Sequence, residues 1–438
     1  MEPGAFRPRP PSFVVAASPT RGAPAGRIIL DNMTVAPPPN RLPGARFRVA
    51  RADLYFGLVV LVAYAAISAV VANADKANPD SLMLVAERAL GGRLDSDSLK
   101  GAVDTVNVDG RYYLALGPLQ LLPYLPFAAV PALQGIGRYL ACLLFGIPSA
   151  WLSLPLARAF GARGSVAYWI AAFTAFGSLL FYVSVFGDMY YLAHVEAFLA
   201  LTLFLLEWTG RRRPLALGGL LTVAFLARPT TVLAAVPFGL VLLWKQRSKL
   251  RGAARTALAF GLPIVGGVVF YGWFNWLRFG SPLESGYAIS SLVEPALQAR
   301  RALGVFSVLQ IPENLRLALL SGFRPIDSFP FLVASPWGLS MLLVSPALIT
   351  SAWAGFRDRT ARLLWIAAAL VAVPVFLYYG GGYSQYGFRY SLDFTPFLVA
   401  LMAMGSRRWI GWPERLLVVV SICSVCFGLL WGLSWHAT

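Results

Sequence analysis

Long apolar runs alternate with short charged loops along this chain, and the sign of the loop charge alternates as well. Basic residues gather in every second loop, and acidic residues gather in the others. Segments that cross a bilayer form helices of about 20 apolar residues, and loops rich in Arg and Lys remain on the cytoplasmic side. The alternation therefore predicts an all-α polytopic membrane protein and indicates which loops share a side.

The composition agrees, because 58% of the 438 residues are hydrophobic and only 13% are charged. The formal net charge of +17 lies in the loops rather than on one face of a soluble domain. This distribution argues against a nucleic-acid partner and favours contact with anionic membrane lipids. About eleven spans are expected, over Leu54–Ala74, Tyr139–Leu156, Val166–Phe186, Ala193–Trp208, Leu215–Leu226, Val232–Trp244, Ala257–Leu277, Phe331–Ala354, Leu363–Tyr379, Phe394–Met404 and Leu416–Trp435.

A further apolar stretch, Leu119–Leu133, is predicted not to cross. It contains Pro123, Pro126 and Pro131, which disrupt helices. If it does not cross, the inner side carries 24 basic and 6 acidic residues and the outer side 13 basic and 14 acidic residues, giving net charges of +18 and −1. A crossing here would turn every later basic loop outward, against the positive-inside tendency.

The same reading divides the chain into a tail and a membrane domain. Residues 1–50 are rich in Pro, Ala and Arg without apolar periodicity, which predicts a disordered basic cytoplasmic tail. Residues 51–438 form the membrane domain, with a first outer loop over 75–135 and a long outer loop over 278–330. Helical spacing in Leu82–Gly91 predicts an amphipathic helix on the membrane surface.

Several ionisable residues fall at the expected outer ends of spans. Asp75 and Asp80 follow the first span, where a partly desolvated carboxylate can accept a proton. Asp188 ends the third span, and His194 and Glu196 begin the fourth. Ionisable groups within a membrane are costly and indicate function by default. The alternatives are a solvated loop charge for the first two, and a hydrogen-bonded pair that joins spans for the last two.

Two outer arginines depart from the charge pattern. Arg228 lies between two short apolar runs, and a guanidinium group suits a phosphate there. The alternative is an arginine that extends to lipid headgroups. Arg389 lies near Gln385 and could bind phosphate or sugar, or it could pair with Asp393 at i+4 and cap the span.

Short motifs in a fixed order resemble the glycosyltransferase C superfamily of integral membrane enzymes, which includes protein O-mannosyltransferases and aminoarabinose transferases. The resemblance covers roughly residues 54–405. Its pieces are Gly92-Arg93-Leu94, Asp109–Tyr113, Ala193-His194-Val195, Ala227–Thr230, Asn275–Pro282 with Gly286-Tyr287, and Gln385–Phe397.

The resemblance implies transfer of a sugar from a polyprenyl-phosphate carrier to a hydroxyl on a lipid or glycan acceptor, at the outer face of the cytoplasmic membrane. The family's acid in the first outer loop would correspond to Asp75, or alternatively Asp80, and its second acid to Asp188. Cations stabilise a departing lipid phosphate, which nominates Arg228 and Arg389, with Lys76 as a lesser candidate. Tyr113 is a candidate substrate contact, as are His194, Glu196 and Gln385.

No cofactor is expected, although a divalent ion shared by Asp75 and Asp188 is an alternative. Two other functions are open: a transporter or flippase of a lipid-linked sugar, and a non-catalytic assembly protein. Transporters often show inverted repeats and polar residues midway through spans. Here the polar residues cluster at outer span ends, which favours the enzyme.

Overall fold

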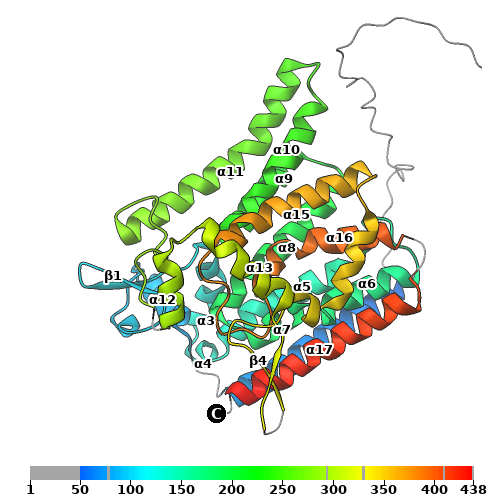
Figure 1. Cartoon of the computed structure of the whole chain (residues 1–438). Coiled ribbons are helices and arrows are strands. Elements are labelled where there is room, and N and C mark those ends of the chain that lie inside the picture. The colour runs from blue at the N-terminus through cyan, green and yellow to red at the C-terminus, as the bar shows by residue number, and fades with distance from the viewer. Residues whose placement is uncertain (1–49, 76–78, 293, 328–330, 408–409, 437–438) are drawn as a thin grey trace, which may run out of the picture. The chain divides into compact units, whose positions relative to one another are not determined.

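The computed structural model describes residues 50–75, 79–292, 294–327, 331–407 and 410–436, and residues 50–438 form one compact unit. The tail expected over 1–50 therefore lies outside the described residues, apart from Ala50. The described part is dominated by helices (Figure 1). The longer helices are α1 (Arg51–Ala74), α5 (Gly137–Ala159), α6 (Ser165–Phe176), α7 (Leu179–Phe186), α8 (Met189–Thr209), α9 (Pro214–Ala227), α10 (Ala235–Trp244), α11 (Leu250–Phe279), α15 (Arg359–Leu377), α16 (Thr395–Gly405) and α17 (Trp412–His436).

Shorter elements fill the connections. They are α2 (Ser81–Leu90), η1 (Asp97–Leu99), η2 (Leu119–Tyr124), α3 (Leu125–Ala128), α4 (Pro131–Gln134), η3 (Pro229–Ala234), α12 (Pro295–Ala302), η4 (Val308–Gln310), α13 (Ile311–Leu320), α14 (Met341–Val344), η5 (Pro346–Ala354) and η6 (Arg389–Asp393). Two antiparallel hairpins complete the fold: β1 (Thr105–Val108) pairs with β2 (Arg111–Leu114), and β3 (Phe323–Pro325) with β4 (Leu332–Ala334).

Six helices of the described part are long and apolar enough to cross a membrane, or seven if the bent pair α6–α7 forms one span. The pair bends by 42° at Gly177 and Ser178, where the Ser178 hydroxyl caps α7. Helices α9 and α16, and the η3–α10 segment, are apolar but shorter. The structure thus agrees with a polytopic membrane protein, whereas it does not confirm the expected count of eleven.

One expected span is not a single helix. Phe331–Ala354 contains strand β4, the four-residue helix α14 and the 3₁₀ segment η5. Pro336 and Pro346 interrupt its backbone hydrogen bonding, which the apolar composition alone did not indicate. By contrast, Leu119–Leu133 forms only the short elements η2, α3 and α4, in agreement with the prediction that its prolines prevent a continuous span.

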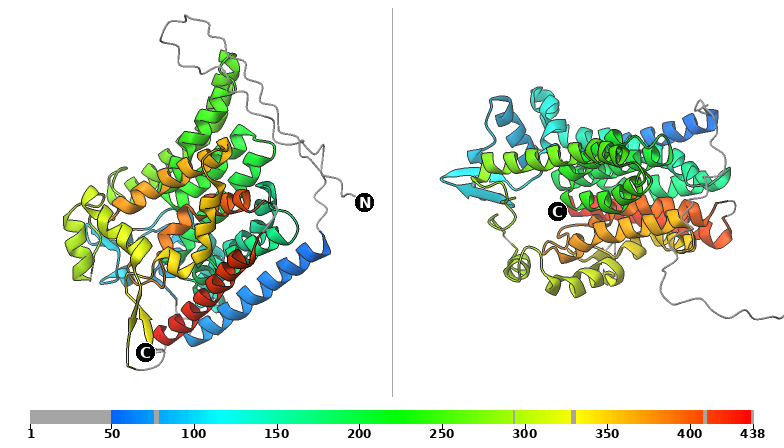
Figure 2. Two further views of the ribbon diagram at one scale, coloured as in Figure 1. Left: turned by 45° about the vertical axis from the view of Figure 1, so that its right-hand side comes forward. Right: turned by 90° about the horizontal axis from the view of Figure 1, so that it is seen from above.

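Helix α8 lies at the centre of the bundle, since 78% of its most apolar window is buried, against 22% for α1 and 17% for α11. Helix α8 packs against α5, α9 and α7, and α1 runs beside α17 (Figures 1 and 2). The outer helices leave large apolar side chains exposed, such as Leu58 on α1 and Val269 on α11. Such surfaces suit a lipid environment.

The amphipathic segment expected at Leu82–Gly91 is the helix α2. Its apolar face, formed by Leu82, Met83, Val85 and Ala86, is buried. Because α2 packs on η2 and α3, this face contacts protein rather than the membrane surface. The helix was predicted correctly, but its partner was not.

Ion pairs join residues that were predicted to share a side. On the side with the basic loops, Arg158 pairs with Asp53 at 2.7 Å, and Arg407 pairs with Asp358 at 3.3 Å. On the other side, Arg138 at the start of α5 pairs with Asp75 at the end of α1. The alternation of loop charge therefore agrees with which residues meet in space.

Candidate functional site

A small cavity lies where α1, α5, α7 and α8 meet the segment before η6. Its volume is about 90 Å³, and it is lined by Val71, Asp75, Arg138, Tyr182, Phe186, Asp188, Tyr191, Ser384, Gln385, Trp431 and Gly432. The cavity thus brings together three residues selected from the sequence, Asp75, Asp188 and Gln385. It adds Arg138, which sequence reasoning did not select.

Asp75 is already engaged by protein groups. The Arg138 guanidinium forms an ion pair with it, and the Tyr139 hydroxyl donates a hydrogen bond to its Oδ2 at 2.6 Å. A nearby positive charge and a donated hydrogen bond both favour the charged form of a carboxylate. Asp75 is therefore suited to orient Arg138 beside the cavity, more than to remove a proton from a substrate.

Asp188 occupies the sharp turn between α7 and α8. Gly187 takes a left-handed conformation (φ 54°), and a Cβ there would lie 2.6 Å from the Cα of Tyr139, so glycine is required. Asp188 then caps α8, because its Oδ1 accepts a hydrogen bond from the Tyr190 amide at 2.7 Å. Within the described part of the chain, its Oδ2 has no hydrogen-bond partner. This oxygen is available at the cavity.

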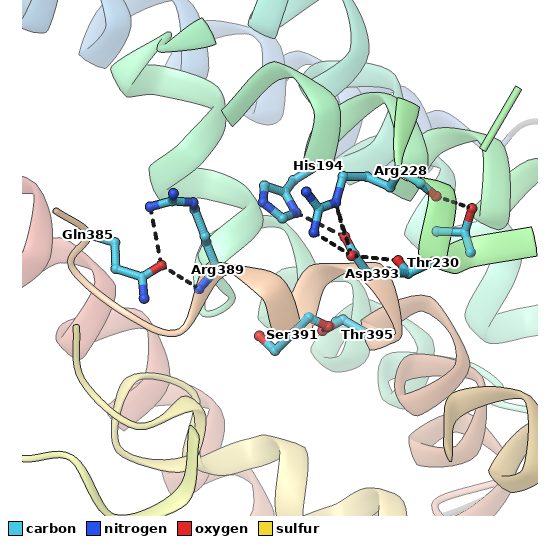
Figure 3. A network of polar contacts seen from close by, with 9 residues as sticks. His194, Arg228, Thr230, Gln385, Arg389, Ser391, Asp393 and Thr395 are labelled. Carbon is cyan, nitrogen blue, oxygen red and sulfur yellow. Dashed lines mark hydrogen bonds and ion pairs between the residues drawn. The ribbon is translucent and has the colours of Figure 1, made fainter. Parts of the chain in front are cut away.

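Gln385 lines the same cavity and is hydrogen-bonded to Arg389 (Figure 3). The Gln385 amide group donates to the Trp337 carbonyl at 2.9 Å, and its Oε1 accepts from the Arg389 amide at 3.1 Å. The Arg389 guanidinium carbon lies 5.8 Å from the Tyr191 ring centroid and 5.3 Å from that of Tyr390. Among the described residues, the buried Arg389 Nε has no hydrogen-bond partner. The Arg389 Nη1 donates to the Tyr383 carbonyl at 3.2 Å and to Gln385 Oε1 at 3.4 Å, so the segment before η6 positions both the backbone and the guanidinium of this arginine.

Asp393 is the centre of a buried network rather than a partner of Arg389 (Figure 3). Arg228 donates to Asp393 through Nε at 3.0 and 3.1 Å, and its Nη2 lies 2.9 Å from the carboxylate. His194 Nδ1 lies 2.9 Å from Oδ1, and the Thr230 hydroxyl donates to Oδ2 at 3.1 Å. Arg228 and Arg389 approach the same Tyr390 ring, at 4.9 and 5.3 Å. The i,i+4 pair of Arg389 with Asp393, which was the alternative to ligand binding, is not formed.

This network changes the interpretation of Arg228 and His194. The charge of Arg228 is compensated by Asp393, which is fully buried, so the guanidinium joins α9 to η6 rather than presenting a free cation. His194 joins α8 to the same carboxylate. Both residues support the loop that carries Arg389. The sequence pointed to the two segments that form the network, Ala227–Thr230 and Gln385–Phe397. It did not show that Arg228 and His194 both contact Asp393.

Asp104 is a second residue that sequence reasoning missed. It precedes β1 with a positive φ of 57°, a conformation that Asp and Asn adopt more readily than other residues except glycine. Burial raises its pKa, and a hydrogen bond with Tyr190 and the charges of Arg389 and Arg301 partly oppose this effect. Tyr190, in the first turn of α8, is thus hydrogen-bonded to Asp104 through its side chain and to Asp188 through its backbone amide. No local pattern marked Asp104, because its neighbours come from distant segments.

The remaining candidates lie elsewhere or are differently engaged. Asp80 caps α2 through the Met83 amide at 2.9 Å and accepts from the Tyr124 hydroxyl at 2.7 Å. Tyr113 is buried in β2 and packs edge-on against Phe279 at 6.1 Å, away from the cavity lining.

Glu196 is buried within α8, and neither of its oxygens has a hydrogen-bond partner among the described residues. Lys76 lies outside the described residues. In the part of the chain that the structure describes, no group of three or more His, Cys, Asp or Glu side chains is placed to hold a metal ion.

Comparison with family models, with curated proteins and with solved structures finds no match for this chain.

Proposed function

We propose that this protein is a membrane glycosyltransferase that moves a sugar from a polyprenyl-phosphate carrier to a hydroxyl acceptor. The observation that carries the proposal is the cavity shared by Asp75, Asp188 and Arg138. Transfer of a sugar needs a carboxylate to accept the proton of the attacking hydroxyl, and cations to stabilise the departing phosphate. The cavity supplies both kinds of group, beside a second cation, Arg389.

We assign the base to Asp188. Its Oδ1 is fixed by the Tyr190 amide, which leaves Oδ2 to accept the proton of the acceptor hydroxyl. As the C–O bond of the donor breaks, negative charge develops on the carrier phosphate. Arg138, held by Asp75, and Arg389, whose backbone is positioned by Gln385, would stabilise this charge. The acceptor oxygen bonds to the sugar, and the carrier leaves as a polyprenyl phosphate.

The proposal includes the membrane arrangement. The seven longer spans, the three shorter apolar helices and the interrupted segment α14–η5 would give eleven crossings in a glycosyltransferase C type of fold. The ends that carry Arg158, Arg213 and Arg407 would face the cytoplasm, and the cavity would face the outer side of the cytoplasmic membrane.

The test uses the purified full chain in liposomes with a panel of polyprenyl-phosphate sugars carrying a labelled lipid. Release of free polyprenyl phosphate is measured, with and without hydroxyl acceptors. Asp188→Asn retains an oxygen that can cap α8 and removes only the charge, so we expect turnover to fall about 10²–10⁴-fold. Asp97→Asn, at an exposed acid of the first outer loop, is the matched control and should retain turnover.

Asp104→Asn is a second arm, because asparagine tolerates a positive φ. Loss of turnover in Asp104→Asn with full activity in Asp188→Asn would reassign the base to Asp104. If no donor in the panel releases its carrier with the wild-type chain, or if the labelled lipid crosses the bilayer unchanged, the enzyme proposal fails.

A further inference from the structure

The turn between α10 and α11 is a cluster of positive charge that contains no acidic residue. Residues 245–255 contain five cations and no acid, namely Lys245, Arg247, Lys249, Arg251 and Arg255. All five side chains are exposed.

Other basic segments at this end of the bundle are paired with acids. Arg158 pairs with Asp53 at 2.7 Å, and Arg213 pairs with Glu207 at 3.0 Å. Asp358 likewise lies 3.3 Å from its basic partner on the neighbouring loop. The α10–α11 turn has no acid in its own sequence with which to form such a pair.

An apolar groove begins directly beside this turn. It has a volume of about 270 Å³ and is lined by Ala235, Val236, Gly239, Leu240, Leu242, Leu243, Thr256, Ala257 and Phe260. Leu243 lies two residues before Lys245, and Thr256 directly follows Arg255. The groove therefore runs along α10 and α11 away from the cations. In Figure 1 the two helices lie at the edge of the bundle. Val236 and Leu240 in the groove lining are 51% and 64% exposed, so the groove is accessible to lipid.

We propose that the α10–α11 hairpin binds an anionic glycerophospholipid, with an acyl chain in the groove and the headgroup phosphate on the cations of residues 245–255. An acyl chain matches the apolar lining, and an anionic headgroup neutralises a charge that the protein leaves uncompensated. A lipid without net charge could place an acyl chain in the groove, but it would not neutralise the cations of residues 245–255. This site is separate from the cavity at Asp188, so it does not depend on the proposed enzyme function.

The test measures lipid binding to the purified full chain by native mass spectrometry, with phosphatidylglycerol and phosphatidylcholine of identical acyl chains. We expect phosphatidylglycerol to bind about 5–25-fold more tightly, since each cation near an anionic headgroup contributes about fivefold and a single phosphate contacts one or two of them. The variant with Lys245, Arg247, Lys249 and Arg251 changed to Gln should lose this preference. A control with the same loss of charge, Arg163, Arg211, Arg357 and Arg362 changed to Gln, should retain it. Those exposed cations lie outside the α10–α11 turn, in other loops or in the first turn of α15.

A second pair of variants tests the groove. Ala257→Trp places a large side chain in the lining and should weaken phosphatidylglycerol binding several-fold. Leu258→Trp is the control, since Leu258 is 67% exposed and is not part of the lining. Three results would overturn the proposal: equal binding of the two lipids, unchanged binding in Ala257→Trp, and preferential binding of a polyprenyl phosphate or of a second copy of the chain at this face.

Discussion

The buried pair of Arg228 and Asp393 allows a quantitative prediction about stability. The Asp393 side chain is 0% exposed and the Arg228 side chain 18% exposed, and three contacts of 2.9–3.1 Å join them. Asp393→Asn preserves the shape of the side chain but leaves the Arg228 charge without its partner. Breaking a buried ion pair in this way costs about 3–5 kcal/mol. Because Arg228 retains some access to solvent, we expect about 3 kcal/mol.

Thiol labelling in the native state measures this cost. Cys142 is fully buried in α5, whereas Cys423 and Cys426 are exposed. In a variant with both exposed cysteines changed to Ala, labelling of Cys142 requires the structure to open. When opening is in rapid equilibrium, 3 kcal/mol corresponds to labelling that is about 150-fold faster.

The double variant separates the ion pair from other effects. Arg228→Gln alone should accelerate labelling to a similar degree, because Asp393 would lose its principal counter-charge. The combination of Arg228→Gln with Asp393→Asn removes both charges and should be less destabilised than the sum of the single variants, by at least about 1 kcal/mol. Additive effects within about 0.5 kcal/mol would refute the claim that this pair joins α9 to η6.

Three further predictions follow from single residues. Burial raises the pKa of Asp80 to about 6, so the folded protein binds this proton more tightly than the unfolded chain does. The free energy of unfolding should therefore fall by up to about 3 kcal/mol as pH rises from about 4 to 6, and stay constant above about pH 6. In denaturation measured against pH, Asp80→Asn should remove this dependence. Gly187→Ala should cost about 2–5 kcal/mol, because the added Cβ meets Tyr139. Gly280→Ala, at another left-handed glycine (φ 72°) with no atom within 4 Å of the added Cβ, should cost only the backbone strain of about 1–2 kcal/mol. Thermal denaturation in detergent that ranks the two equally would contradict the contact with Tyr139. Arg158→Gln should lower the free energy of unfolding by no more than about 1 kcal/mol in the same assay, because the Arg158 side chain is 38% exposed. A loss as large as that of Asp393→Asn would show that solvent exposure does not determine how much these ion pairs contribute to stability.

The sequence was informative wherever a local pattern decides the structure. Apolar length predicted α1, α5 and α8, and the prolines of Leu119–Leu133 correctly indicated a segment without a continuous helix. Loop charge anticipated which residues share an end of the bundle, as the pair of Arg158 with Asp53 illustrates. These features depend on periodicity, composition and helix-breaking residues that lie close together in the chain.

The partners of polar residues were not predictable in the same way. Arg228 was expected to bind a phosphate, but it binds Asp393, 165 residues away. Asp75 was favoured as the base because it follows the first span, yet Arg138 and Tyr139 engage its carboxylate. Arg138 was not predicted as a site residue, although it precedes the expected span Tyr139–Leu156 on the predicted outer side. The same feature, an arginine on the outer side, had led to the selection of Arg228. Contacts of this kind depend on how helices pack, and a single sequence does not encode them in any local pattern.

The central claim is that the cavity beside Asp188 opens to the outer side of the membrane and receives the lipid-linked donor. Ser384 lines this cavity and is exposed. In a chain whose three native cysteines are replaced by Ala, Ser384→Cys should react with a membrane-impermeant thiol reagent in intact cells, and added polyprenyl-phosphate sugar should slow the reaction. Arg211→Cys, in a basic loop, should react only after permeabilisation. Reaction at position 211 in intact cells, with none at 384, would contradict the account.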